Sequence, residues 1–367
     1  MVEISAAVVR ENRGPFSIEK GLTLDEPRPD EVLVRMVGVG VCHSDIYESQ
    51  VGPTPAVHGH EGAGIVVRVG SAVTRFAEGD RVLMSFASCG ACRNCLEGRP
   101  AYCEKFMTLN LSGARADGSR PIKDATGQEV FSNFFGQSSF ADHALAAERN
   151  LVKVPDSVPD ELFTVLGPLG CGVQTGAGAV LNTFNPNAGS TILVAGAGGV
   201  GLSAVLGAVV ASATKIAVLD VIPSRLELAT ELGATHTVNG KDADVVARLR
   251  EIAPGGFDYA LETTGNSQVL RTLVETTRVG GQVGLIGAGK PGAEVTFKHS
   301  SLLSGPIVRG IFEGDSVPQQ FIPRLIDLHQ AGRFPFDKLV KTYPFEQIQR
   351  AVDDSEAGTT VKAVLTF

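Results

Sequence analysis

The sequence has 367 residues, of which 43% are hydrophobic and 20% charged, so it has the composition of a globular protein that is too long for a single core. With 32 Lys and Arg against 40 Asp and Glu, the formal net charge is −8 and no basic run occurs, which disfavours a surface for nucleic acids or anionic membranes. No stretch is typical of a membrane-spanning helix, and the acidic residues of the first segment do not fit a signal peptide, so we expect a cytoplasmic protein.

The first part of the chain is predicted to form a domain rich in β-strands. Short runs of β-branched residues there are separated by Gly, Pro and Asp. The predicted strands cover residues 4–9, 31–39, 64–69 and 81–86.

Cys42 and His60 lie between these strands and are candidate metal ligands. A thiolate and an imidazole both bind zinc. The same two residues also fit a buried cysteine and a histidine in a turn, so the pair by itself leaves both interpretations open.

Four further cysteines follow the pattern Cys89-x-x-Cys92-x-x-Cys95-x7-Cys103. Four thiolates in one short loop can close a tetrahedral shell around zinc without an open position, which is typical of a structural site. An iron-sulfur cluster or a redox-active loop is the alternative, although the usual ferredoxin run has a different spacing and a trailing proline. We therefore predict a structural zinc lobe at about residues 88–104.

Three segments before the middle of the chain give weaker signals. Residues 104–137 show no sustained period and are predicted to be a long loop. Residues 134–140 carry three phenylalanines that fit either a core or a pocket wall. Cys171 stands between two glycines, which would let a metal or cofactor approach, but it also fits a cysteine in a turn without any ligand role.

The strongest single motif is a glycine-rich turn that follows an apolar run. The glycines let the backbone approach a pyrophosphate at a helix N-terminus, and the acid after the second strand can accept hydrogen bonds from the ribose of a dinucleotide. A glycine-rich turn that binds nothing is the alternative. In chain order the motif consists of residues 191–195, the glycines Gly196, Gly198 and Gly201, residues 216–219 and Asp220.

Beyond this motif, β-like and helical segments alternate. Six parallel strands with crossover helices predict a doubly wound sheet. The strands are expected at residues 191–195, 216–219, 235–238, 259–262, 282–286 and 308–311, with helices at 225–232, 243–252 and 268–276.

The alternation stops after Phe312. Helices are expected at residues 318–331 and 345–355, and a last strand at residues 361–367. Because no helix follows this strand, we expect the chain to return to the first domain.

Taken together, these motifs resemble the zinc-dependent, medium-chain alcohol dehydrogenases over nearly all of the chain. The aryl-alcohol (benzyl-alcohol) branch, which includes geraniol-type enzymes, is the most similar branch. The family pieces are CHSD at 42–45, GHEGAG at 59–64, the four-cysteine lobe, GPLGCGVQTGAG at 167–178, GAGGVG at 196–201, Asp220 and TTVKAVLTF at 359–367; FFGQSSFADHAL at 134–145 and FIPRLIDLHQAGRFPFDKL at 321–339 favour the branch.

The resemblance implies an α/β fold with two domains. Residues 1–172 and 312–367 would form a GroES-like β-barrel catalytic domain that carries the structural zinc lobe. Residues 173–311 would form a Rossmann domain with a six-stranded parallel sheet, through which the chains pair into dimers or tetramers.

The resemblance also implies the roles of individual residues. Cys42, His60 and Cys171 match the catalytic zinc ligands, and Glu61 matches a carboxylate that can enter the shell, while Cys89, Cys92, Cys95 and Cys103 hold the structural zinc. Ser44 matches the hydroxyl that bonds the alcohol oxygen, and Asp45 the acid that orients His60. The residues that match contacts to NAD are His43, Thr175, Gly196, Gly198, Gly199, Val200, Gly201, Asp220, Arg225 and Lys362.

Three features depart from the family pattern. His43 stands where many relatives have an arginine on the pyrophosphate, so the grip on the cofactor should weaken as pH rises. Tyr47 stands where liver-type relatives have a histidine that ends the proton relay, and a tyrosine with a pKa of about 10 is a poor base, so water or His43 should carry the proton out. The interval between Cys42 and His60 is shorter than usual, at residues 49–55, so the resemblance does not define the shape of one wall of the substrate pocket.

The activity implied is reversible hydride transfer from a primary aromatic or allylic alcohol to NAD, giving aldehyde and NADH. Ser44 accepts the alcohol proton, and an apolar pocket that includes Phe140 and residues near Phe312 holds the ring. The alternatives are a general aliphatic or a thiol-adduct (formaldehyde-type) alcohol dehydrogenase, a non-catalytic protein that binds zinc and NADH, and a nucleic-acid binder that uses the zinc lobe. The intact zinc ligands argue against the non-catalytic protein, and the net charge argues against nucleic acid.

Overall fold

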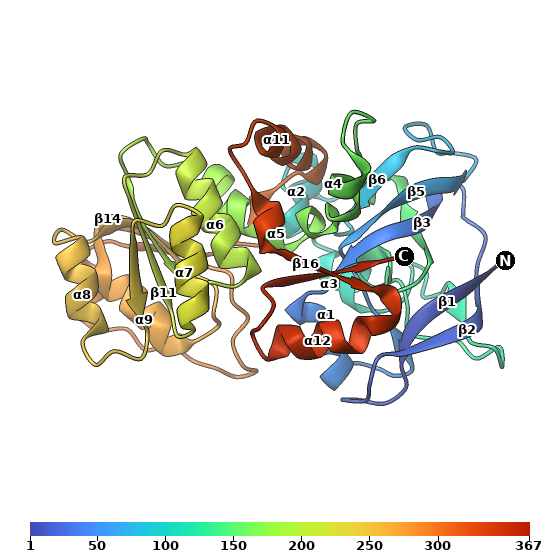
Figure 1. Cartoon of the computed structure of the whole chain (residues 1–367), viewed down its shortest axis with the longest axis horizontal. Coiled ribbons are helices and arrows are strands. Elements are labelled where there is room, and N and C mark those ends of the chain that lie inside the picture. Colours follow the sequence, from blue (N-terminus) through green and yellow to red (C-terminus); the bar gives the residue numbers. More distant parts are fainter. The chain divides into compact units, whose positions relative to one another are not determined.

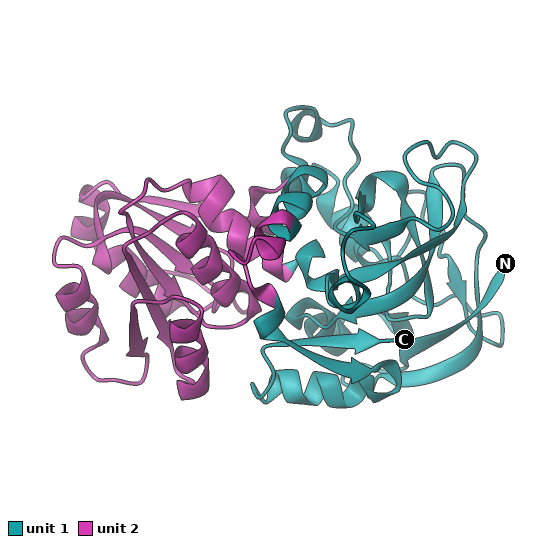
Figure 2. Cartoon of the chain, turned by 45° about the horizontal axis from the view of Figure 1, so that its top comes forward, with its two compact units in different colours: residues 1–171, 317–326, 337–367 teal, residues 172–316, 327–336 magenta.

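The computed structural model describes all 367 residues and divides the chain into two compact units (Figure 2). The first unit consists of residues 1–171, 317–326 and 337–367, and the second of residues 172–316 and 327–336. The sequence placed the domain boundaries after residue 172 and before residue 312. The observed second unit also includes Gly172 and residues 312–316 and 327–336, which the sequence had assigned to the first domain.

The first unit is built around a seven-stranded sheet (Figure 1). Its long strand β3 (Glu31–Gly40) is buried along most of its length and pairs antiparallel with three neighbours, so it anchors the unit. The strands expected at 31–39, 64–69 and 81–86 are confirmed. The order is β16 (Val340–Pro344), β17 (Lys362–Thr366), β3, β5 (Gly62–Val69), β6 (Arg81–Met84) and β9 (Leu151–Lys153), with β8 (His143–Ala147) also paired to β3.

A four-stranded sheet completes the β-structure of this unit. It contains the strand expected at 4–9 and a strand that the sequence did not reveal, β2 (Ser17–Leu24). The segment SIEKGLTL carries charges and a glycine and buries only Leu22 and Leu24, so it has no clear period, and its pairing along β1 makes it a strand. The order is β4 (Ala56–Val57), β1 (Val2–Val9), β2 and β7 (Ile122–Lys123).

The expected return of the chain to the first unit is confirmed. Strand β17 pairs antiparallel with β3, with Val364 opposite Gly40, and parallel with β16. Helices α11 (Pro318–Gln330) and α12 (Ile348–Glu356) precede it. The remaining helices of the unit are short: α1 (His43–Val51), α2 (Arg93–Leu96), α3 (Phe106–Leu111) and α4 (Asp160–Thr164).

Residues 104–137 contain more structure than the long loop that we expected, because they form α3 and β7. Helix α3 depends on the buried side chain of Asn110. Its amide donates to the carbonyl oxygens of Phe106 and Ala87, and its oxygen accepts from the N–H of Ala87. A six-residue helix that is held by one amide leaves no periodic pattern in the sequence.

The second unit contains the expected six-stranded parallel sheet, which confirms the doubly wound fold. The strand order reverses between β10 and β13, so ligands are expected at the carboxyl end of β10. The order is β12 (His236–Asn239), β11 (Lys215–Asp220), β10 (Thr191–Ala195), β13 (Phe257–Glu262), β14 (Thr277–Leu285) and β15 (Ile307–Gly310).

The helices of the second unit connect these strands. Leu249 of α8 and Leu270 and Leu273 of α9 pack in one core with Leu193 and Val283 of the sheet, so both helices cover the same face. The helices are α5 (Gly172–Gly178), α6 (Gly199–Val210), α7 (Pro223–Glu231), α8 (Val245–Ile252), α9 (Ser267–Thr276) and α10 (His299–Leu303).

None of the helices in the structure combines the length and the apolar character that a membrane crossing requires.

A buried ion-pair cluster ties the segment after α3 to the start of β3. The guanidinium of Arg115 forms two hydrogen bonds with the carboxylate of Glu31, at 2.7 and 2.9 Å, and a third with Asp25 at 2.7 Å. The side chains of Arg115 and Glu31 are only 5% and 11% exposed. The carboxylate of Glu31 cannot be fully solvated at this depth, so its pairing with Arg115 holds the two segments together.

We expect Arg115→Ala to lower the free energy of unfolding by roughly 3–5 kcal/mol, because it leaves a buried carboxylate without its partner. Urea unfolding followed by circular dichroism measures the change. Arg99→Ala is the control, since Arg99 pairs with Glu97 at the surface and its loss should leave stability nearly unchanged. Equal losses in both variants would contradict a special role for Arg115.

Candidate active site

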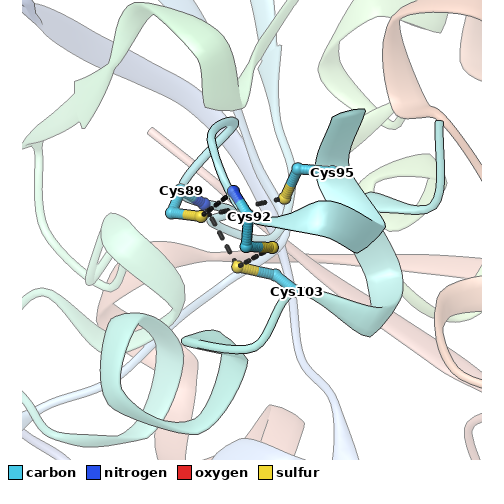
Figure 3. A group of neighbouring side chains, drawn as sticks. All are labelled: Cys89, Cys92, Cys95 and Cys103. Atoms are coloured by element: carbon cyan, nitrogen blue, oxygen red, sulfur yellow. Dashed lines mark hydrogen bonds between the residues drawn. The ribbon is translucent and has the colours of Figure 1, made fainter. Parts of the chain in front are cut away.

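Four cysteine sulfurs converge in a lobe of the first unit (Figure 3). We call residues 88–104 the cysteine lobe; its four Sγ atoms, from Cys89, Cys92, Cys95 and Cys103, lie within 4.8 Å of one another. The separations Cys89–Cys95 and Cys92–Cys103 are both 4.0 Å, close to the roughly 3.8 Å between sulfurs that surround one zinc at about 2.3 Å. The donor set therefore fits a single tetrahedral metal ion.

The backbone of the cysteine lobe favours thiolates. The N–H groups of Cys92 and Cys89 point at the sulfurs of Cys89 and Cys103, each at 3.3 Å. Hydrogen bonding from the backbone N–H of Ala91 lowers the pKa of Cys89 to about 6. All six cysteines of the chain are free thiols, which metal binding requires.

A second group of metal-ligand atoms gathers elsewhere in the first unit. We call it the metal cage: one ligand atom from each of Cys42, His60, Glu61 and Cys171, all within 4.8 Å of one another. Cys42 caps the N-terminus of α1, His60 and Glu61 directly precede β5, and Cys171 follows a 3₁₀ turn at Gly167–Gly170. Residues that are far apart in the sequence are thus brought together, as the resemblance implied.

Asp45 orients the histidine of the metal cage. Its carboxylate is fully buried and lies 2.8 Å from Nδ1 of His60, while it also accepts hydrogen bonds from the N–H groups of Gly59 and Cys42, both at 2.9 Å. An ionised carboxylate only accepts, so Nδ1 carries a proton and Nε2 is the nitrogen that can bind a metal. Nε2 is buried without a hydrogen-bond partner, which is the observation that fits a metal ion at this atom.

The thiol of Cys42 is also prepared for metal binding. A hydrogen bond from Cys171 is the main cause that holds the pKa of Cys42 well below its usual range, and the ammonium of Lys362 acts in the same direction against the effect of burial. The backbone next to the second thiol, Cys171, is also held in place, because Oγ of Ser85 donates to the carbonyl oxygen of Gly170 at 2.6 Å.

Glu61 is neutralised by Lys362. The Nζ atom of Lys362 lies 2.9 and 3.0 Å from the two carboxylate oxygens and donates to the carbonyl oxygen of Val41 at 3.1 Å. Both side chains are buried. The resemblance assigned Lys362 to the cofactor; the structure shows its ion pair with Glu61, and a contact to the cofactor stays a prediction.

Aromatic rings surround the histidine of the cage. The ring of Phe135 stacks on His60 with centroids 4.4 Å apart, and Phe134 meets the same ring edge-on at 5.4 Å. Phe140, which the sequence suggested as a pocket wall, is instead fully buried and packs edge-on against Phe16 in the core. The expectation for Phe140 was wrong, and Phe135 is the ring that lies beside the cage.

His58 is a buried histidine that sequence reasoning did not single out. Its ring has no hydrogen-bond partner at either nitrogen and lies among Phe16, Phe131 and Phe134. Burial lowers its pKa to about 4, so it is a neutral ring in an aromatic environment.

In the second unit, the glycine motif forms the turn from β10 into α6. Gly196 has a φ of +96°, and a Cβ atom there would lie 2.4 Å from Oγ1 of Thr263. A Cβ atom at Gly201 would lie 1.7 Å from the carbonyl oxygen of Gly196, whereas one at Gly198 would meet nothing within 4 Å. The turn is closed on one side and open at Gly198, which fits the approach of a pyrophosphate.

Asp220 ends β11 beside this turn. One carboxylate oxygen accepts from the N–H of Ala197 at 2.6 Å and the other from the N–H of Ile222 at 2.8 Å. Each oxygen keeps a further lone pair for a ribose hydroxyl. Asp220 thus also holds the turn in place, which the sequence did not indicate.

The other residues predicted to bind the cofactor are distributed as follows. Gly199 and Val200 begin α6, and Nε of Arg225 on α7 is buried without a hydrogen-bond partner. Thr175 lies on α5, where its hydroxyl donates to Glu313 at 3.4 Å. His43 is exposed on α1 of the first unit.

Comparisons with known proteins agree with this arrangement. Residues 28–156 match the alcohol dehydrogenase GroES-like domain, and residues 199–330 match the zinc-binding dehydrogenase family. A geraniol dehydrogenase of Castellaniella defragrans is 45% identical over 371 residues, which cover 100% of this chain and 98% of that protein.

Two solved structures are similar over the whole chain. One is an alcohol dehydrogenase zinc-binding domain protein from Burkholderia ambifaria, with a TM-score of 0.96, 50% identity and coverage of 100% of this chain and 99% of that one. The other is a benzyl alcohol dehydrogenase from Acinetobacter calcoaceticus, with a TM-score of 0.95, 42% identity and full coverage of both chains. The chain therefore belongs to the zinc-dependent, medium-chain alcohol dehydrogenases, and it has their GroES-like and Rossmann domains.

Proposed function

We propose that this alcohol dehydrogenase oxidises primary aromatic or allylic alcohols with NAD and runs reversibly. The observation that carries the proposal is the donor set of the metal cage. Cys42, His60 and Cys171 offer three strong ligands, while the carboxylate of Glu61 is held by Lys362, so one position is left for a substrate oxygen.

The chain's own residues would hold both cofactors. When bound in the cage, zinc supplies a Lewis acid that makes an alcohol more acidic. When bound at the glycine turn, NAD supplies the hydride acceptor. Cys42, His60 and Cys171 would bind the catalytic zinc, the cysteine lobe a structural zinc, and Gly198 and Asp220 the pyrophosphate and ribose of NAD.

The position of Ser44 supports a role as the acceptor of the alcohol proton. Its Oγ lies 3.9 Å from Sγ of Cys42, so the hydroxyl lies beside the cage and can accept a hydrogen bond from an alcohol there. His43, the preceding residue, is exposed and can pass the proton to water. Tyr47 is also exposed, but its phenol is a weak base near neutral pH.

The substrate class rests on two kinds of support. The whole-length similarity to a geraniol dehydrogenase and a benzyl alcohol dehydrogenase favours alcohols with an adjacent π-system. The cage itself lies in an aromatic environment, because the buried ring of Phe135 stacks on His60. In addition, oxidation beside a ring or an alkene gives a conjugated carbonyl, which lowers the barrier to hydride loss.

We expect two zinc ions in each chain, one in the cage and one in the cysteine lobe. A chelator should remove the cage ion first and abolish activity before the protein unfolds, because the four thiolates of the lobe form a closed shell that stabilises the fold. Elemental analysis of fresh protein, repeated during chelation, measures both steps. One zinc per chain, or iron in the lobe, would contradict this assignment.

We expect at least about 100-fold higher kcat/KM with NAD than with NADP, or ~2.7 kcal/mol, because the charge of Asp220 repels a 2′-phosphate. Asp220→Asn should reduce this ratio at least about tenfold while its remaining oxygen still accepts one backbone N–H. Initial rates with both cofactors measure the effect, and Glu231→Gln at the end of α7 is the control for a lost surface charge. Equal use of both cofactors by the unmodified enzyme would exclude this role of Asp220.

For the substrate, we expect kcat/KM for benzyl alcohol and geraniol to exceed that for ethanol by at least about 100-fold. Cyclohexylmethanol is the matched control, because it has nearly the size of benzyl alcohol but no π-system. It should be oxidised much more slowly if conjugation and ring stacking matter, and as well as benzyl alcohol if burial alone decides. Faster oxidation of ethanol or of S-(hydroxymethyl)glutathione would favour the aliphatic or the thiol-adduct alternative.

A further inference from the structure

The segment at residues 133–140 has an unusual backbone. Asn133, Phe135 and Ser138 all have positive φ angles, of 68°, 51° and 53°. Such conformations are unfavourable for residues with a side chain and persist only where the surroundings hold them. The branch motif FFGQSSFADHAL begins within this segment, and the mechanism derived above does not use its glutamine.

Residues 133–140 are hydrogen-bonded to residues 57–59, which directly precede His60 and Glu61. The N–H groups of Ser139 and Phe140 donate to the carbonyl oxygens of Gly59 and His58, at 2.9 and 3.0 Å. The hydroxyl of Ser138 donates to the carbonyl oxygen of Val57 at 2.7 Å and accepts from the N–H of Phe134 at 2.9 Å. These bonds stop at Gly59, before the metal ligands.

The side chain of Gln137 adds two hydrogen bonds to the backbone on either side of Glu61. Its Nε2 donates to the carbonyl oxygen of His60 at 2.9 Å, and its Oε1 accepts from the N–H of Gly62 at 3.2 Å. Both backbone groups belong to peptides on either side of Glu61. The side chain is only 3% exposed, so water cannot replace it.

The side-chain amide of Gln137 meets both needs. The carbonyl oxygen of His60 needs a donor and the N–H of Gly62 needs an acceptor, and an amide offers both on two separate atoms without charge. The two partners also fix the orientation of the amide, since the reverse orientation would face oxygen with oxygen.

We propose that Gln137 is a positioning residue for the catalytic zinc: its amide fixes the backbone of His60 and Glu61 and so the geometry of the metal cage. The inference rests on the proposed metal site but does not depend on the alcohol that is oxidised. Asp45 holds the ring of His60, whereas Gln137 holds its main chain, and the two act on different parts of one ligand.

Gln137→Met tests the proposal, because methionine keeps the length and bulk but offers neither a good donor nor a good acceptor. We expect release of zinc from the cage to a chromogenic chelator to become at least about tenfold faster, as is typical when a group behind a metal ligand is lost. With cobalt in the cage, the visible absorption bands should shift. Zinc in the cysteine lobe should be released as slowly as in the unmodified protein, which shows that the fold is intact.

Three further variants serve as references and controls for the rate of zinc release. Asp45→Asn should also speed release from the cage. Gln137→Asn keeps both groups on a shorter side chain and should fall between Gln137→Met and the unmodified protein. Ser139→Ala removes a buried hydroxyl of the same segment that has no hydrogen-bond partner, so it should change neither release nor the cobalt spectrum.

Unchanged release and an unchanged cobalt spectrum in Gln137→Met would overturn the positioning role, even if alcohols are oxidised as proposed. Equally fast release in Ser139→Ala, or failure of both Gln137 variants to fold, would overturn it too, because the residue would then serve the segment as a whole. If the unmodified protein holds zinc in the cage but forms no NADH with any alcohol, the proposed function fails while the role of Gln137 stands. If the cage binds no metal, both fail.

Discussion

The metal cage depends on one buried carboxylate. Asp45 joins the start of α1, the turn at Gly59 and the ring of His60, so three parts of the first unit meet at two oxygen atoms. Burying a carboxylate is costly unless its oxygens are bonded, and here donors come from both sides. A second buried carboxylate, that of Glu61, belongs to the cage and is neutralised by Lys362. Both carboxylates are therefore bonded by the chain itself, and the contact of Asp45 with Nδ1 makes Nε2 the nitrogen of His60 that can bind a metal.

The parts of the protein that could be predicted are those whose signals are local. The four cysteines of the lobe lie within fifteen residues, and the glycine turn is followed by its acid after one helix and one strand, so spacing alone indicated their chemistry. The central strands of the parallel sheet, β10, β11 and β13, were also clear, since buried strands form continuous apolar runs. The metal cage was different: Cys42, His60 and Cys171 are far apart, and only the resemblance to a family joined them before the structure brought them together. Their role as ligands, like the pairing of chains into dimers or tetramers, stays a prediction.

The features that could not be predicted depend on contacts between distant segments. Arg115 lies in a segment without any period, and its partners at Glu31 and Asp25 follow only from the fold. Phe140 was mistaken for a pocket residue because the motif gives no sign that all three of its phenylalanines are buried. The role of Gln137 depends on two hydrogen bonds to the backbone, which no spacing of residues in the sequence indicates. In each case the residue type is a common one, and only its position in the fold gives the residue its particular role.

The order of the chain has a consequence for how the protein is made. Strand β17, which pairs with β3 and carries Lys362, follows the whole of the second unit in the sequence. On the ribosome, the segments with Cys42, His60 and Cys171 are therefore complete long before the partner of Glu61 has been synthesised. Until then the carboxylate of Glu61 lacks its cation, and the end of β3 at Gly38–Gly40 lacks a neighbour on one side. The second unit can close its sheet from contiguous residues during synthesis, whereas the metal cage reaches its final form only after β17 has been added.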